Sequence, residues 1–340
     1  MKNQHRRQNL LNQLEEGALV IIATNSEQVR NGDVYYPFRP HSDFWYLTGF
    51  SEPEAVAVFS REDYTIFLRE KDQQREIWDG ERLGVDAAPE SLKTTQAYPI
   101  GVLKTQLPQL IEGASVVYYD FKPCALDDTI MECLATTQTQ SLSEYLHEMR
   151  VIKEEGEIAL MQKAADISVV AHQMAMQQTK PNLFEYEIAS IFDGNFRRHN
   201  SEHAYTPIVA GGKNGCVLHY IKNNQRLRDG DLLLIDAGCE VEGYAADVTR
   251  TFPINGEFNK AQRQVYQIVL DAQLAAIKAI KIGALISTPH KVATQVIRQG
   301  LIELGILQAD GDLSQFYMHG TGHWLGMDVH DVGCYQRDKQ

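Results

Sequence analysis

Two aspartates near the end of an apolar run are the first residues able to do chemistry. Asp236 follows the apolar residues 232–235 within an expected strand at residues 232–237. Asp247 lies in the next β-like run, residues 243–252. If these runs form an antiparallel pair, the two carboxylates can lie side by side. Buried carboxylates repel each other, and a bound divalent cation usually neutralises this repulsion. For an isolated pair at this spacing we favour a structural alternative, in which one aspartate caps a turn and the other pairs with Arg250.

A histidine-rich segment is the second candidate. The stretch MHGTGHWLGMDVHDVG, residues 318–333, holds His319, His323 and His330, three of the 11 histidines in the chain. Histidine is the commonest transition-metal ligand and the usual general acid or base near neutral pH. A lone histidine is more often a packed core residue, but three beside glycines that permit close backbone approach indicate a site. A fourth, His219, follows a glycine-rich turn in NGCVLHY.

Aspartates and histidines together form a mixed oxygen and nitrogen donor set. Such a set suits Mn, Co, Fe or Zn better than Ca, which prefers oxygen ligands alone. Carboxylates shared between two ions are typical of hydrolases that place an activated water against a carbonyl. The spacing therefore predicts a divalent metal site of the hydrolase kind.

The elements that must position these residues form a two-domain α/β frame. The chain has 340 residues with 44% hydrophobic and 23% charged content, which excludes a disordered chain, a collagen or a disulfide scaffold. Strands interleaved with helices, and a charged segment near residue 150, predict domains 1–150 and 151–340. The pattern predicts strands at 18–23, 55–59, 65–68 and 116–119, and helices at 8–15, 157–178, 184–199, 260–281 and 290–304.

Charge and cysteine content limit the binding partners and the cellular compartment that we expect for the protein. The net charge of −13 makes nucleic acids and anionic membranes poor partners. The five cysteines are widely spaced and odd in number, which indicates reduced thiols. No run approaches the roughly 18 apolar residues of a membrane span, and the N-terminus lacks a clean signal-peptide core. We expect a cytoplasmic protein, with the basic cluster at residues 5–7 as a solvated helix start.

The motifs IDAG, GYAADVTRTFP, HGTGHWLG and VHDVG together resemble those of the pita-bread metallopeptidases, and specifically of the aminopeptidase P (Xaa-Pro aminopeptidase) family. Residues 30–59 (RNGDVYYPFRPHSDFWYLTGFSEPEAVAVF) and 76–90 (EIWDGERLGVDAAPE) resemble the N-terminal domain of the bacterial members. The resemblance implies an α/β (α+β) protein, with a creatinase-like N-terminal α/β domain followed by a pita-bread catalytic domain.

The same resemblance implies a metal site with two divalent ions. Asp236 would bind one ion, Asp247 would bridge both, and His323 would bind the other. The family pattern indicates Mn²⁺ as the metal, with Co²⁺ or Zn²⁺ as alternatives.

Four further residues match positions near the substrate in the family. His219 and His330 would stabilise the scissile carbonyl and the tetrahedral intermediate, and His319 matches a further active-site histidine. Trp78 matches an aromatic that helps close the substrate pocket near the oligomer contacts.

The implied activity is release of the N-terminal residue from peptides with proline in second position. The implied partners are proline-containing peptides and further copies of the chain, as a dimer or tetramer. One alternative is a Xaa-Pro dipeptidase (prolidase), which takes only dipeptides. Another is a non-catalytic pita-bread protein that binds peptides or proteins.

Two glutamate ligands implied by the resemblance have no counterpart in this sequence. One would follow the histidine segment in a PG-x-x-x-(T)-x-E-P motif, and the other would lie on the last strand. The last glutamate here is Glu303. We therefore expect a truncated form of an ordinary enzyme, with an incomplete catalytic domain and metal site and impaired activity.

Overall fold

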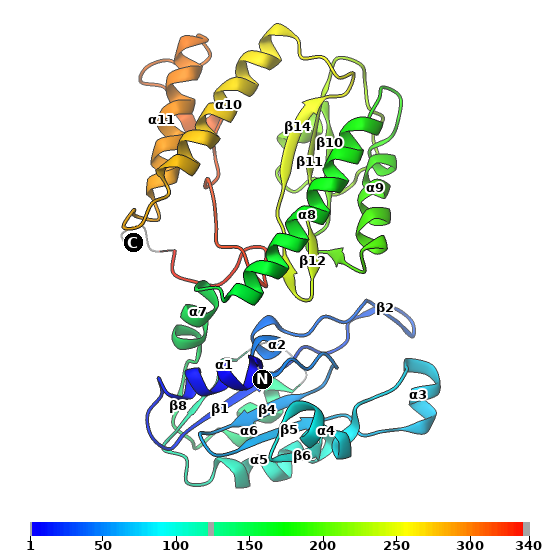
Figure 1. The fold of residues 1–340 in the computed structure, drawn as a ribbon, viewed down its shortest axis with the longest axis vertical. Helices are drawn as coiled ribbons and strands as arrows, with labels where there is room; N and C mark the ends of the chain where they lie inside the picture. The colour runs from blue at the N-terminus through cyan, green and yellow to red at the C-terminus, as the bar shows by residue number, and fades with distance from the viewer. Residues whose placement is uncertain (1, 122–125, 336–340) are drawn as a thin grey trace. The chain divides into compact units, whose positions relative to one another are not determined.

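The structure is a computed structural model that describes residues 2–121 and 126–335. The chain divides into two compact units, residues 1–149 and 150–340 (Figure 1). Each unit has its own sheet and its own hydrophobic core.

A mixed six-stranded sheet forms the centre of the first unit. Its central strands β1 (Ala18–Ala23), β4 (Val56–Phe59) and β5 (Tyr64–Leu68) are antiparallel neighbours and are buried along their whole length. Parallel strands complete the order β6-β5-β4-β1-β7-β8: β6 (Gln96–Pro99), β7 (Val116–Tyr118) and β8 (Thr139–Gln140). Strands that are buried on both faces must be covered on both faces by other elements. A mixed sheet covered by helices is the predicted α/β class.

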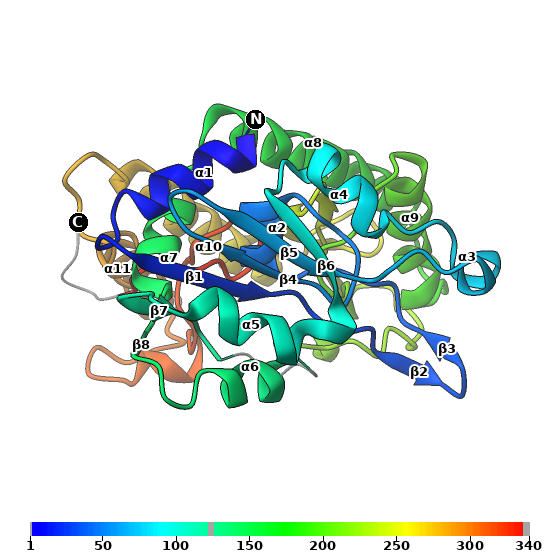
Figure 2. The same cartoon turned by 90° about the horizontal axis from the view of Figure 1, so that it is seen from below.

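Helices supply that cover. On one face, α5 (Leu103–Ile111) and α6 (Asp127–Cys133) bury Leu107 and Ile130 against Phe67 of the sheet (Figure 2). Helix α1 (Lys2–Leu11) packs against α2 (Ser42–Thr48), and α2 contacts β1. The remaining elements are β2 (Val29–Asn31), β3 (Val34–Tyr35), α3 (Gln73–Asp79), α4 (Gly84–Leu92), η1 (Ile100–Val102) and α7 (Ser143–Val151).

The N-terminal helix differs from its prediction. It spans Lys2–Leu11 instead of residues 8–15, and Arg6 and Arg7 are only 3% and 5% exposed. Arg7 Nη1 donates to the Leu47 carbonyl at 2.7 Å, and the Arg6 guanidinium lies 3.9 Å from the centre of the Tyr46 ring. The solvated helix start is therefore wrong, because the cations bind the carbonyls that the last turn of α2 leaves unpaired.

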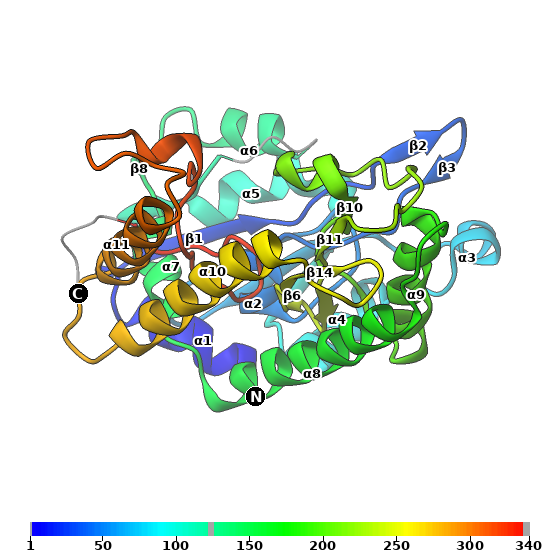
Figure 3. The same cartoon turned by 90° about the horizontal axis from the view of Figure 1, so that it is seen from above.

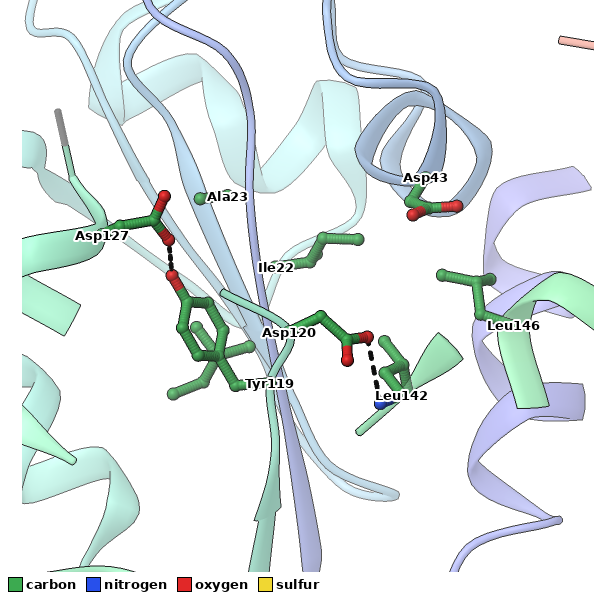
Figure 4. A pocket seen from close by; sticks show the side chains of 9 residues that line it. Ile22, Ala23, Asp43, Tyr119, Asp120, Asp127, Leu142 and Leu146 are labelled. Atoms are coloured by element: carbon green, nitrogen blue, oxygen red, sulfur yellow. Dashed lines mark hydrogen bonds between the residues drawn. The ribbon is translucent and has the colours of Figure 1, made fainter. Parts of the chain in front are cut away.

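A cavity of about 10 Å³ lies in the first unit, about the smallest space that holds one water molecule. Figure 4 shows three of its carboxylates, Asp43, Asp120 and Asp127. Asp127 accepts a hydrogen bond from Tyr119, and Asp120 accepts one from the backbone N–H of Leu142 at 3.1 Å. These two carboxylates therefore tie structural elements together.

In the second unit, α8 (Glu155–Gln178) and α9 (Glu185–Arg198) pack against a three-stranded sheet (Figure 3). Its order is β10 (Ile208–Gly211), β11 (Leu232–Asp236), β14 (Thr249–Pro253). A small second sheet contains β9 (Glu202–His203), β12 (Cys239–Val241) and β13 (Tyr244–Ala245). The other elements are η2 (Gly212–Cys216), the packed pair α10 (Lys260–Ala279) and α11 (Thr288–Glu303), and η3 (Leu313–Gln315).

The four helices predicted after residue 150 are confirmed, with ends that agree within two residues. Among the described helices, none is both long enough and apolar enough to cross a membrane.

Candidate functional site

One long hairpin carries both aspartates of the candidate site. Strand β11 pairs with β14 so that Asp236 lies opposite Thr249. Beyond this pair, β12 and β13 continue the same register towards the tip. The chain reverses at Glu242 and Gly243, which both have positive φ, as a two-residue hairpin turn requires.

Asp247 lies in an interruption of the strand predicted at residues 243–252. Residues 246–248 belong to neither β13 nor β14, and the residue opposite Asp236 is Thr249. It precedes Thr249 by two residues and is therefore a diagonal neighbour of Asp236 on one face. The turn at Glu242 and Gly243 sets this diagonal placement.

Gly238 allows the two chains to approach at this interruption. A Cβ at Gly238 would lie 1.9 Å from the carbonyl oxygen of Ala246, which no side chain can tolerate. Glycine is therefore needed between the two aspartates for a steric reason.

Tyr205 links the two aspartates, and sequence reasoning missed it. Its hydroxyl lies 2.5 Å from Oδ1 of Asp236 and 3.0 Å from Oδ1 of Asp247, within hydrogen-bond distance of both. Arg250 instead donates to the Thr249 carbonyl at 2.8 Å, so the alternative ion pair is not what holds the site. The only available signal was the place of Tyr205 shortly before β10, which pairs with β11.

Burial governs the protonation of this group. Burial raises the pKa of Asp236, the hydrogen bond from Tyr205 opposes the rise, and the charge of Asp247 adds to it. Burial, followed by the two carboxylates, raises the pKa of Tyr205 well above its usual range. The tyrosine therefore stays a neutral donor that reduces the repulsion between the carboxylates.

The histidine segment meets the hairpin at Asp247. His323 Nε2 lies 3.0 Å from Oδ2 of Asp247, and the side chains are 29% and 24% exposed. The rings of His323 and His330 are 4.3 Å apart between centres, in an edge-to-face arrangement. The structure thus brings together Asp236, Asp247, His323 and His330.

The other site residues predicted from the sequence lie outside this group of contacts. His319 is exposed and contacts the Tyr317 ring at 5.2 Å, and His219 is exposed in the loop after η2. Trp78 lies on α3 of the first unit and is 84% exposed.

A buried glutamate organises the loop that carries His219, and sequence reasoning missed it too. Glu185 begins α9 and is 0% exposed. Its carboxylate accepts hydrogen bonds of 2.7–2.9 Å from four donors of residues 211–225: Gly211 N, Asn214 Nδ2, Tyr220 Oη and Gln225 N. A buried charge with this many donors is satisfied without a cation, so it stabilises one conformation of the loop.

The donor set fits divalent ions in its chemistry. Asp247 is the shared member, because Tyr205 connects it to Asp236 and its second oxygen faces His323. Across the described parts of the chain, no three His, Cys, Asp or Glu side chains converge closely enough to hold an ion. The observed arrangement is therefore two carboxylates joined through Tyr205, with one imidazole against Asp247.

Models of two protein families match the chain. The description "Aminopeptidase P, N-terminal domain" matches residues 3–118, and "Metallopeptidase family M24" matches residues 159–340, more than half of the chain. The chain belongs to metallopeptidase family M24. The resemblance seen in the sequence motifs is thereby confirmed.

Curated M24 relatives carry the same name in two bacteria. The chain is 44% identical to the Xaa-Pro aminopeptidase of Haemophilus influenzae, over 99% of this chain and 82% of that protein. It is 42% identical to the Xaa-Pro aminopeptidase of Escherichia coli, with the same coverage.

Solved structures of M24 proteins agree with the fold. The low-pH form of aminopeptidase P from E. coli matches with a TM-score of 0.94 at 40% identity, over 99% of this chain and 82% of that one. The Zn-substituted E. coli aminopeptidase P in complex with product has the same TM-score, identity and coverage. The chain is therefore an M24 hydrolase with an aminopeptidase P N-terminal domain, in a family that uses divalent metal ions.

Proposed function

We propose that this M24 chain removes the N-terminal residue from peptides whose second residue is proline, with divalent metal ions as cofactors. The observation that carries the proposal is the contact series Asp236–Tyr205–Asp247–His323, which gathers two carboxylates and an imidazole at one edge of the hairpin. The names of the bacterial relatives support the substrate class.

The contacts of Asp247 with Tyr205 and His323 support the metal ligands that the family resemblance implies. Asp236 would hold one ion, Asp247 would bridge two, and His323 would hold the second. We propose Mn²⁺, with Co²⁺ or Zn²⁺ as alternatives. When bound, such ions supply Lewis acidity and a water nucleophile at neutral pH. Tyr205 keeps the two carboxylates oriented on one side of the hairpin.

The histidines handle the substrate in this proposal. His330, whose ring touches that of His323, donates an imidazole N–H to the scissile carbonyl oxygen and stabilises the charge that develops there. His219 and His319 complete the set of donors around the peptide. Trp78 would help close the substrate pocket near the oligomer contacts. A dedicated enzyme is needed because a proline amide lacks an N–H and has a restricted φ.

The test is a metal-dependent assay on the purified chain. A tripeptide with proline in second position, supplied with Mn²⁺, should release its first residue as a free amino acid, at the impaired rate expected of this chain. Asp247→Asn should abolish this release and the heat of Mn²⁺ binding in calorimetry while leaving the circular dichroism spectrum intact. The matched control is Asp271→Asn, which changes an exposed aspartate of α10 and should retain both.

Two results would overturn the assignment. Near-normal release by Asp247→Asn would remove the metal site from the reaction. Cleavage of the dipeptide alone, with the tripeptide untouched, would point to a dipeptidase.

We also propose that the chain forms a homo-oligomer, a dimer or tetramer, through the first unit. The β2–β3 hairpin and α3 both project from that unit (Figures 1 and 2). Both elements carry exposed apolar side chains. They are 48–84% exposed: Val29, Val34, Tyr35, Tyr36, Ile77 and Trp78. Because monomers rarely expose such apolar clusters, light scattering should give a multiple of 38.4 kDa, and Trp78→Ser should lower it.

We propose the cytoplasm as the location. The support is that Cys133, Cys216, Cys239 and Cys334 are free thiols, while Cys124 lies outside the described residues. Cell fractionation that recovers the chain outside the cytoplasm would contradict this.

A further inference from the structure

A buried ion cluster lies at the base of the loop that carries two of the site histidines. Asp331 directly follows His330 and is 2% exposed. Its Oδ1 accepts a hydrogen bond from Arg150 Nη2 at 2.6 Å, and its Oδ2 accepts one from Lys153 Nζ at 2.9 Å. Arg150 Nη2 also contacts Asp328 Oδ2 at 2.8 Å. We call these four residues the Asp331 ion cluster.

A backbone hydrogen bond of Asp331 closes the loop whose ends adjoin both histidines. The Asp331 N–H donates to the Trp324 carbonyl at 3.0 Å and closes the loop of residues 324–331. His323 immediately precedes one partner of this bond, and His330 immediately precedes the other. The two rings therefore stand at the two ends of the closed loop, in contact with each other.

The packing around Asp331 leaves little freedom for another arrangement. A Cβ at Gly326 would lie 2.1 Å from Oδ2 of Asp331 and 3.0 Å from Cε of Lys153. The Gly326 carbonyl accepts a hydrogen bond from the Ala245 N–H at 2.8 Å, which joins the loop to β13 of the aspartate hairpin. The carboxylate thus lies against a position that only glycine fits, beside the hairpin that carries Asp247.

The charges of the cluster balance, with two carboxylates and two cations. A buried ion pair adds little stability compared with apolar packing, because both ions lose their hydration. Its hydrogen bonds have narrow geometry, however, and in this cluster they hold one loop conformation. The cluster is consequently better suited to positioning than to general stabilisation.

We propose that Asp331, held by Arg150 and Lys153, is a positioning residue that sets the place of His323 and His330. The effect on catalysis rests on the function proposed above, whereas the effect on the two imidazole rings does not. Partners behind metal-binding or substrate-binding side chains typically change activity by about 10–100-fold when they are removed.

The experiment compares Asp331→Asn with Asp328→Asn in the full chain labelled with ¹⁵N at histidine. Asp328→Asn is the matched control, because its carboxylate contacts the same arginine but its side chain is 40% exposed. The imidazole ¹H–¹⁵N signals of His323 and His330 are assigned from His323→Gln and His330→Gln. His203, which pairs with Asp193 at 2.7 Å elsewhere in the unit, serves as the internal reference.

We expect Asp331→Asn to shift or broaden the signals of His323 and His330 and to leave that of His203 unchanged. In the Mn²⁺-dependent tripeptide assay we expect a fall of kcat by about 10–100-fold with little change in KM. Asp328→Asn should change both readouts far less. Arg150→Lys, which keeps the charge, should retain more of the wild-type signal positions than Arg150→Met.

Unchanged His323 and His330 signals in folded Asp331→Asn overturn the proposal, as do shifts that affect His203 equally. If Asp331→Asn does not fold, Lys153→Met decides, because it removes one hydrogen bond and retains the Arg150 pair. If the wild-type chain shows neither turnover nor Mn²⁺ binding, the proposed function fails, while the imidazole signals still decide the positioning role.

Discussion

Replacing Glu185 by glutamine tests how the loop that carries His219 is held. The substitution keeps the shape of the side chain and turns one carboxylate oxygen into an NH₂ donor. Oε1 can still accept from Gly211 N and Asn214 Nδ2. The new NH₂ group faces Tyr220 Oη and Gln225 N, which both donate to Oε2 in the native protein.

The expected cost follows from these four bonds. The Tyr220 hydroxyl can rotate and accept from the NH₂ group, but the Gln225 N–H is left without an acceptor. An unpaired buried N–H costs about 1–3 kcal/mol, and the remaining bonds weaken because they no longer end on a charge. We therefore expect a loss of about 3 kcal/mol, which corresponds to a factor of about a hundred in an equilibrium constant.

The assay is hydrogen exchange measured by mass spectrometry, together with urea unfolding. Peptides covering residues 208–225 should exchange about a hundredfold faster in Glu185→Gln if exchange follows local opening. The matched control is Glu187→Gln, two residues further along α9, where the exposed side chain accepts from Phe184 N at 2.7 Å. A glutamine oxygen can replace that acceptor, so the control should stay within about 0.5 kcal/mol of wild type.

The reasoning is refuted if Glu185→Gln exchanges like the control within residues 208–225. Such a result would mean that the strand pairing of β10, and not the carboxylate, holds the loop. Faster exchange spread evenly over the whole second unit would also refute a local role.

Three further predictions concern single residues. Gly238→Ala places a Cβ 1.9 Å from the Ala246 carbonyl oxygen. The melting temperature measured by calorimetry should therefore fall by several degrees. An unchanged melting temperature would show that the hairpin can widen freely. Burial raises the pKa of Tyr64 to about 12 from 10.0, so stability is complete below pH 10 and is lost as the pH rises towards 12. This loss amounts to about 3 kcal/mol in total. Tyr64→Phe removes the ionising hydroxyl, so it should abolish this loss of stability in urea titrations above pH 10. The Tyr64 hydroxyl has no hydrogen-bond partner among the described residues, so its removal breaks no hydrogen bond there. An equal loss in wild type and Tyr64→Phe would contradict the prediction. Burial lowers the pKa of His172, whose Nε2 lies 3.0 Å from the Ala237 carbonyl oxygen. The stability that this group contributes is therefore present above pH 6.5 and is lost as the pH falls below it. His172→Gln should flatten that part of the stability–pH profile, and a profile identical to wild type would contradict the role of His172.

The sequence alone determined the family, the candidate donors and most of the elements that carry them. Asp236, Asp247 and His323 stand in motifs that can be read within a few residues, and the helices after residue 150 follow from local periodicity. The family was evident from the same motifs. Local patterns suffice here because strand alternation, helix periodicity and motif spacing are all encoded at short range.

Only the tertiary structure decided which side chains support those donors. Tyr205 contacts Asp236 across 31 residues of sequence, and Arg150 contacts Asp331 across 181. The register that makes Asp247 a diagonal neighbour of Asp236 appeared only when the Glu242–Gly243 turn was located. Contacts of this kind depend on which strands pair and how loops close, and no local pattern in the sequence encodes that choice.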